Sequence, residues 1–201
     1  MKKYSNSYWP FELDRVETFA YKDEVFNKKE CEKVIDISKK IGLEKGQVLT
    51  KNNILGKDKM RNSDICFLPI SKDTGWIYTR IASSINFLNN TFFKFDISGL
   101  AENIQFSSYK APGGKYGKHT DRAMGIIVRK LSASIQLSDP DSYEGGDLVF
   151  HLGGKPFKKE KEDRNQGRLT VFPSYTVHEV TPVTKGKRYS LVCWVTGKQF
   201  K

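Results

Sequence analysis

The chain has 201 residues and carries 34 Lys and Arg against 23 Asp and Glu, a formal net charge of +11 at pH 7. Its 38% hydrophobic and 12% aromatic content is enough for a real core, which excludes intrinsic disorder. No run reaches the roughly 18–20 apolar residues of a membrane span, and three widely spaced cysteines match neither a disulfide framework nor a paired metal-binding motif. We therefore expect a protein without a membrane segment in a reducing compartment, the cytoplasm.

The charge surplus is a weak indicator of function. Only 8 of the 34 basic residues are Arg, whereas specific readers of nucleic acid depend on Arg for bidentate contacts. A surface rich in Lys is more typical of solubility than of a binding site. A nucleic-acid partner is therefore not expected.

The first hundred residues are predicted to be mixed, with two helices. Asn27 followed by Glu30 is typical of a capping box, which opens a helix that Gly42 ends. Residues at helical spacing predict its buried face: Cys31, Val34, Ile35, Ser38 and Ile41.

Residues 45–59 are polar and rich in Lys, Asn and Gly, so we expect a mobile loop there. The run 65–68 predicts a short buried strand that Pro69 stops. A second amphipathic helix should start near Asp73 or Thr74, and its buried face is predicted to contain Ile77, Ile81, Ile85, Leu88 and Phe92.

From about residue 103 the pattern changes to short β-type runs separated by turn residues. Glycines between the runs, at 113–114, 145–146, 153–154 and 186, are typical of turns. This spacing predicts a closed or two-sheet antiparallel barrel in one domain over residues 1–201, with a mixed part over about 1–100 and a β core over about 101–198. The predicted strands are 104–109, 116–120, 131–137, 147–152, 168–172, 176–180 and 188–196.

The three histidines of the chain, His119, His151 and His178, all lie in this β-rich half. On an extended segment His119 and Asp121 project to the same side, so both side chains can reach one ion. With His178 as a third ligand they would form the two-His, one-carboxylate triad of non-haem Fe(II) oxygenases. A His-x-Asp pair alone also fits a polar strand edge without a metal, and His151 is predicted to be an ordinary strand histidine.

The flanking sequence supports the metal hypothesis. Five ordered motifs, within residues 109–121, 131–140, 145–148, 167–173 and 178–188, resemble the 2-oxoglutarate- and Fe(II)-dependent dioxygenases of the prolyl 4-hydroxylase type. The resemblance is greatest to the bacterial and viral branch of prolyl- and lysyl-hydroxylase-domain proteins, and it extends more loosely upstream through residues 61–68 and 76–77.

This resemblance implies an α+β, mainly β fold: a double-stranded β-helix, or jelly roll, with the N-terminal helices packed on it. It also implies hydroxylation of an unactivated C–H bond, on a prolyl residue of a peptide or protein, with succinate and CO2 as co-products. The implied cofactor is Fe(II), with 2-oxoglutarate and O2 as co-substrates and ascorbate as a reductant.

The resemblance also assigns site residues. His119, Asp121 and His178 would bind Fe(II), and Arg188 would pair with the distal carboxylate of 2-oxoglutarate. For the co-substrate it also implies Tyr109, Gln136 and Trp194, and some relatives have a second tyrosine at the position of Gln136. For the substrate it implies Arg129, Arg61 and Tyr116.

Alternatives stay open at this point. Arg188 could pair with a surface carboxylate, and Tyr109, Gln136 and Trp194 could serve core packing alone. The chain could be a non-catalytic jelly-roll binding module, a zinc hydrolase, or a dioxygenase acting on another amino-acid residue, a small molecule or a nucleic-acid base. A hydrolase would need a nearby base, and Glu179, next to His178, should point the opposite way along the strand.

Overall fold

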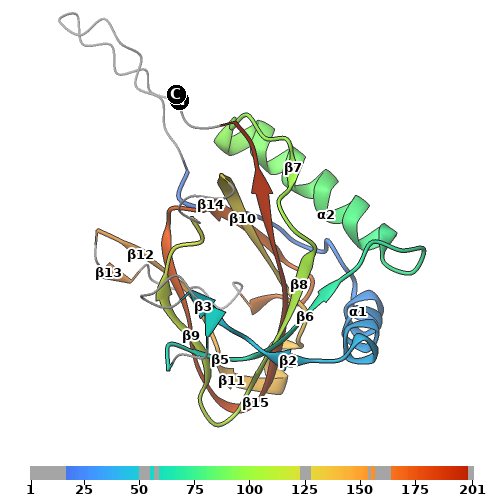
Figure 1. The fold of residues 1–201 in the computed structure, drawn as a ribbon, viewed down its shortest axis with the longest axis vertical. Helices are drawn as coiled ribbons and strands as arrows, with labels where there is room; N and C mark the ends of the chain where they lie inside the picture. The colour runs from blue at the N-terminus through green and yellow to red at the C-terminus, as the bar shows by residue number, and fades with distance from the viewer. Residues whose placement is uncertain are drawn as a thin grey trace, which may run out of the picture.

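One long strand, β15 (Val177–Thr196), organises the fold. The computed structural model describes residues 17–49, 55–56, 59–122, 128–153, 155–156 and 164–198. The first part of β15 pairs with β9 (Gly114–His119) and β12 (Leu148–Leu152), and its second part pairs with β8 (Ile104–Lys110) and β10 (Arg129–Gln136). The same strand therefore joins two antiparallel sheets (Figure 1).

The larger sheet has the order β1-β14-β10-β15-β8-β6-β2, and β7 pairs with the end of β15. On the other sheet β5 pairs with β9, β11 pairs with the middle of β15, and β13 pairs with β12; β3 and β4 form a separate pair. The bounds not yet given are Ala20–Lys22 for β1, Glu44–Lys45 for β2, Val48–Leu49 for β3, Leu55–Gly56 for β4, Arg61–Asn62 for β5, Asp64–Leu68 for β6, Gly99–Leu100 for β7, Tyr143–Gly145 for β11, Lys155–Pro156 for β13 and Leu169–Pro173 for β14.

The first helix, α1 (Lys28–Ile41), begins and ends where the sequence predicts. The amide of Glu30 donates to Asn27 Oδ1 at 3.0 Å, the amide of Asn27 donates to Glu30 Oε2 at 2.9 Å, and Gly42 follows the last turn with a φ of 96°. Cys31, Val34 and Ser38 are buried, but the prediction for Ile41 was wrong because its side chain is exposed. At 100° per residue Ile41 lies about 80° around the helix from Cys31, at the edge of the buried stripe.

The second helix, α2 (Gly75–Leu88), buries four predicted side chains, Ile77, Ile81, Ile85 and Leu88. The prediction that Phe92 continues this face was wrong: Phe92 is exposed and Phe93 is buried. The cause is a π-helical turn over Asn89–Phe93, because its wider i to i+5 spacing shifts the inward position by one residue.

Two segments of the β pattern differ from the prediction. The expected loop 45–59 contains short strands in its described residues, and residues 50–54 and 57–58 lie outside them. The runs 176–180 and 188–196 belong to one strand rather than two, so Lys185 and Gly186 lie within β15 and do not make a turn between strands. Gly186 lies opposite Tyr143 at a φ of 71°, and a Cβ there would lie 2.3 Å from the carbonyl oxygen of Ser142, so close backbone approach requires this glycine.

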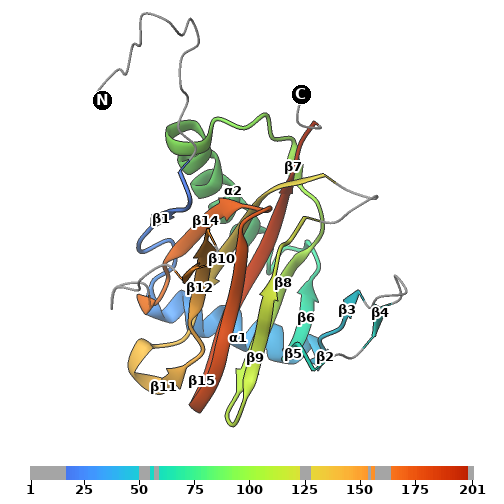
Figure 2. The same ribbon diagram turned by 90° about the vertical axis from the view of Figure 1, so that its left-hand side faces the viewer.

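The two faces of the larger sheet have opposite character. Both helices lie on its outer side, where the main apolar core forms (Figure 2). Strand β10 shows the alternation: Leu131, Ala133 and Ile135 belong to this core, whereas Ser134 and Gln136 line a cavity on the other face. The inner face is therefore polar and suited to a ligand. Among the described residues, neither helix is long and apolar enough to cross a membrane.

Candidate functional site

The register of two strands brings the predicted metal ligands together. His119 of β9 lies directly opposite His178 of β15, and Asp121 follows β9 by two residues. The Nε2 atoms of His119 and His178 each lie 3.5 Å from an oxygen of Asp121, one from Oδ1 and the other from Oδ2. Ligand atoms of all three side chains lie within 4.8 Å of one another, and no other group of three such side chains comes this close in the part of the chain that the structure describes.

Backbone carbonyls orient both imidazole rings. His119 Nδ1 donates to the carbonyl of Gly117 at 2.7 Å, and His178 Nδ1 donates to the carbonyl of Thr176 at 3.0 Å. Because a carbonyl only accepts, each Nδ1 carries the hydrogen and each Nε2 keeps its lone pair. This arrangement is typical of metal-binding histidines.

Burial and neighbouring groups shift the pKa values of Asp121 and His178. Burial disfavours the charged form of Asp121, but the two histidines beside it hold the pKa of its carboxyl well below the usual range. Burial lowers the pKa of His178, so this ring stays neutral near pH 7. Two imidazoles that each have a free Nε2 lone pair, together with one carboxylate, fit a divalent cation such as Fe(II) and leave coordination positions open for further ligands.

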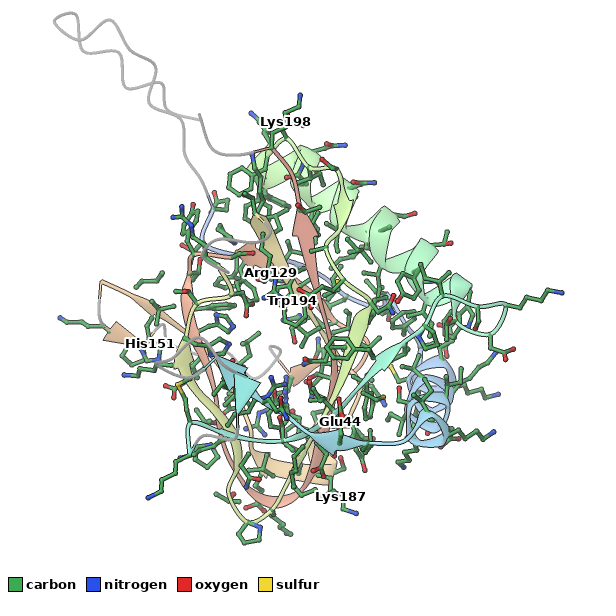
Figure 3. All side chains as sticks on the ribbon, viewed as in Figure 1. Glu44, Arg129, His151, Lys187, Trp194 and Lys198 are labelled. Carbon is green, nitrogen blue, oxygen red and sulfur yellow. The ribbon has the colours of Figure 1, made fainter. Side chains whose placement is uncertain are left out.

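The remaining histidine lies elsewhere, as the sequence predicts. His151 Nε2 lies 2.8 Å from an oxygen of Glu179, and Figure 3 shows His151 beside β13, away from the labelled Arg129 and Trp194. Glu179 thus points away from His178, so it is not placed to act as a base at the cluster.

Arg188 is buried without an acidic partner among the described residues. Its side chain is 3% exposed, donates to Ser190 Oγ at 3.3 Å and packs over the ring of Tyr109, which lies opposite it on β8, at 5.4 Å. An unpaired buried guanidinium is costly unless an anion accompanies it. Among the described residues Arg188 forms no ion pair with a surface carboxylate, which was the alternative left open by the sequence.

Arg188 lines a polar cavity on the inner face of the larger sheet. Two other guanidiniums reach it, but Arg164 donates to Asp147 at 2.8 Å and Arg168 donates to Asp23 at 2.7 Å. Among the described residues that line the cavity, the charge of Arg188 is therefore the one left uncompensated, which suits a single carboxylate. The full lining is Ser134, Gln136, Tyr143, Gly146, Asp147, Leu148, Arg164, Arg168, Thr170 and Arg188.

The predicted residue Gln136 lies in this cavity, bonded to a neighbour that the sequence analysis missed. Its Nε2 donates to the hydroxyl of Tyr143 at 2.6 Å. The one sequence signal for Tyr143 is its place just before the glycines at 145–146. Arg164 was also missed, because nothing in its local sequence marks it.

Arg129 and Trp194 form a second group beside the histidine cluster. The Arg129 guanidinium lies 4.1 Å from the centre of the Trp194 ring, and both are labelled in Figure 3. Arg129 also forms an ion pair with Glu102 and donates to the backbone carbonyl of Asp121 at 3.2 Å. Glu102 is a further residue that the sequence analysis missed.

Tyr116 and Arg61 lie on another side of the cluster. The ring of Tyr116 stacks on His119 with centroids 3.6 Å apart, and the Arg61 guanidinium lies 4.7 Å from the centre of the Tyr116 ring. Arg61 also donates to Ser63 Oγ and to the carbonyl of Gln47. Nine of the ten predicted site residues thus lie in the cluster, in the Arg188 cavity or in side-chain groups that touch the cluster, and the tenth, Tyr109, packs on Arg188. Their roles stay predictions.

Comparison with known proteins finds relatives of the β-rich half of the chain. The profile of the 2OG-Fe(II) oxygenase superfamily matches residues 104–196. A PKHD-type hydroxylase of Teredinibacter turnerae is 38% identical over 97 residues, which cover 45% of this chain and 41% of that protein. A PKHD-type hydroxylase of Synechococcus sp. is 40% identical over 89 residues, which cover 44% of this chain and 39% of that protein. The matched part thus spans about two fifths of the length of these relatives.

Solved structures with the same fold include two prolyl hydroxylases. One, from Trichoplax adhaerens in complex with a hypoxia inducible factor peptide fragment, has a TM-score of 0.71 and 18% identity, covering 90% of this chain and 84% of that one. A prolyl-4-hydroxylase of Pseudomonas putida has a TM-score of 0.67 and 19% identity, and the match covers 90% of this chain and 94% of that one. The predicted mainly β fold, a double-stranded β-helix with helices packed outside, is confirmed. Residues 104–196 thus match the 2OG-Fe(II) oxygenase superfamily, whose members use Fe(II), 2-oxoglutarate and O2.

Proposed function

We propose that this protein is a hydroxylase that uses Fe(II) and 2-oxoglutarate to oxidise a C–H bond of a prolyl residue in a peptide or protein, with succinate and CO2 as co-products. The observation that carries the proposal is that one strand, β15, contributes His178 to the cluster with His119 and Asp121 and contributes the unpaired Arg188 to the polar cavity. This combination would provide a metal site and an anion site in one barrel.

Each part of the site has a role in the proposal. Fe(II), held by the triad, would supply the activation of O2 for hydroxylation. Arg188 would bind and orient the distal carboxylate of 2-oxoglutarate, since a planar guanidinium pairs with a carboxylate through two hydrogen bonds. Tyr109, packed on Arg188, would hold the co-substrate from the neighbouring strand. The chain would thus contribute positioning and exclusion of water rather than acid–base catalysis.

A peptide or protein substrate is supported by the fold neighbours, one of which contains a peptide. Arg129, Arg61 and Tyr116 are the proposed contacts: Arg129 and Tyr116 touch the metal cluster, and Arg61 packs on Tyr116. Trp194 would form an apolar wall under Arg129. The proline target rests on this similarity together with the PKHD-type relatives.

The alternatives have less support. A binding module without catalysis has no need of both a metal triad and an unpaired buried Arg188 in one barrel. A zinc hydrolase would require a base, yet Glu179 is bonded to His151. We also place the protein in the cytoplasm, because Cys31, Cys66 and Cys193 are free and buried.

The test is turnover by protein purified without oxygen and then supplied with Fe(II), 2-oxoglutarate and air. We expect succinate to form, and a library of proline-containing peptides should increase the rate and include products that gain one oxygen at proline by mass spectrometry. Omission of Fe(II) is the matched control. Absence of succinate would reject the oxygenase, whereas oxidation confined to residues other than proline would reject only the prolyl substrate.

A further inference from the structure

Tyr143 shares the cavity of Arg188, although nothing in the family resemblance assigns it a role. Its side chain is 4% exposed, and it lies on the short strand β11 opposite Gly186. A Cβ at Gly146 would lie 3.1 Å from Arg188 Cδ and 3.5 Å from Tyr143 Cε2. The absence of a side chain at Gly146 therefore lets the guanidinium and the phenol face one space.

The hydrogen bond between Gln136 and Tyr143 leaves a donor unused. Gln136 Nε2 donates to the Tyr143 oxygen at 2.6 Å, so the hydroxyl hydrogen of Tyr143 has no acceptor in that bond. If the amide were turned by 180°, the phenol would donate to Gln136 and the amide N–H groups would be free instead. In either arrangement the pair presents at least one hydrogen to the cavity.

The charges around the pair favour a ligand with one negative charge. Arg164, whose guanidinium lies 5.2 Å from the centre of the Tyr143 ring, is balanced by Asp147, and Arg168 is balanced by Asp23. Arg188 supplies the one uncompensated positive charge, and Tyr143 supplies a neutral donor beside it. A carboxylate has two oxygens, so it can accept from Arg188 and from the phenol at the same time.

We propose that Tyr143 is a second anchor for the distal carboxylate of 2-oxoglutarate and that Gln136 is a positioning residue that holds the Tyr143 hydroxyl toward it. This inference rests on the proposed function, because it takes 2-oxoglutarate as the occupant of the Arg188 cavity. It changes the role predicted for Gln136: the amide acts through Tyr143, and the phenol makes the contact.

The test is equilibrium binding, measured by calorimetry on the Mn(II)-loaded protein without turnover. Two ligands are compared: 2-oxoglutarate, and 2-oxobutanoate, which has the same 2-oxo acid group but lacks the distal carboxylate. Tyr143→Phe removes only the hydroxyl, so we expect its affinity for 2-oxoglutarate to fall about tenfold and its affinity for 2-oxobutanoate to stay unchanged. Gln136→Leu should show the same selective loss to a smaller extent.

The double variant tests whether the two residues act as one unit. If Gln136 acts through Tyr143, adding Gln136→Leu to Tyr143→Phe should weaken 2-oxoglutarate binding no further. Tyr78→Phe is the matched control, because the Tyr78 hydroxyl also forms hydrogen bonds but lies outside the cavity. It donates to the carbonyl of Leu68 and accepts from the amide of Ile104. This control should bind both ligands like the wild type.

Three results would overturn the inference. Tyr143→Phe could bind 2-oxoglutarate within about twofold of the wild type, or it could lose affinity equally for both ligands, which indicates a structural role. An additive loss in the double variant would remove the positioning role of Gln136. A wild-type protein that binds no 2-oxoglutarate would instead reject the proposed function, and the inference with it.

Discussion

His119 and His178 lie directly opposite each other on antiparallel strands, with ring centres 4.3 Å apart. Each ring is held by a carbonyl two residues before it in the chain, Gly117 for His119 and Thr176 for His178. The site is thus formed by strand register and by hydrogen bonds close in sequence. A shift of register by one residue would turn one ring to the other side of the sheet.

The first prediction concerns the metal. His178→Ala removes one of three ligands, so we expect the affinity for Fe(II) or Mn(II) to fall by about 100-fold or more and succinate formation to stop. Metal titration by calorimetry measures the first effect. His151→Gln is the matched control, since it replaces a histidine bonded to Glu179 outside the cluster, and it should retain wild-type affinity. Unchanged metal binding in His178→Ala would remove His178 from the site.

The second prediction concerns the buried charge of Arg188. Arg188→Ala should raise the dissociation constant for 2-oxoglutarate by about 10- to 100-fold, because a charged hydrogen-bonded pair is lost. Arg188→Lys keeps the charge but not the planar donors, so its affinity should be intermediate. Binding to the Mn(II)-loaded protein measures both, with Arg80→Lys, at a surface ion pair with Glu30, as the control. An unaltered 2-oxoglutarate titration in Arg188→Ala would show that another group anchors the co-substrate.

Local sequence patterns predicted most of this fold because they depend on interactions between residues close in the chain. Asn27 and Glu30 satisfy helix amides within one turn, and the alternation on β10 follows from the geometry of a strand. The failures depend on the tertiary structure. Continuity of β15 through Gly186 is stabilised by pairing with β11, more than forty residues away in the chain, and no local signal distinguishes it from a turn.

In the site too, residues with a local pattern were predictable and residues that depend on tertiary contacts were not. His119 and Asp121 were predictable from their spacing, and the family resemblance assigned Arg188. Tyr143 was not predictable, since its role depends on a hydrogen bond to Gln136 across a turn and on the missing side chain at Gly146. Contacts of this kind depend on how strands are placed, which periodicity does not encode.

The third prediction tests the π-helical turn after α2. Phe93 is buried in the main core and Phe92 is exposed, although the helical pattern predicts the opposite. Phe93→Ala should lower the free energy of unfolding by about 3–5 kcal/mol, and Phe92→Ala by less than about 1 kcal/mol. Urea unfolding of both variants measures the difference. Equal losses would show that the turn in solution does not place these two rings as described.

The fourth prediction concerns the three thiols. Burial, reinforced by the charges of Glu30 and Glu32, raises the pKa of the Cys31 thiol to about 12; burial raises that of Cys193 to about 12 and that of Cys66 to about 11. The thiolate is the reactive form, and a raised pKa leaves almost none of it at pH 8. Native protein should therefore resist alkylation by iodoacetamide at pH 8, while protein unfolded in guanidinium chloride should react at all three positions, as counted by mass spectrometry. Rapid modification of one cysteine in the native protein would show that its side chain is exposed by local opening, and the modified position would identify the segment that opens.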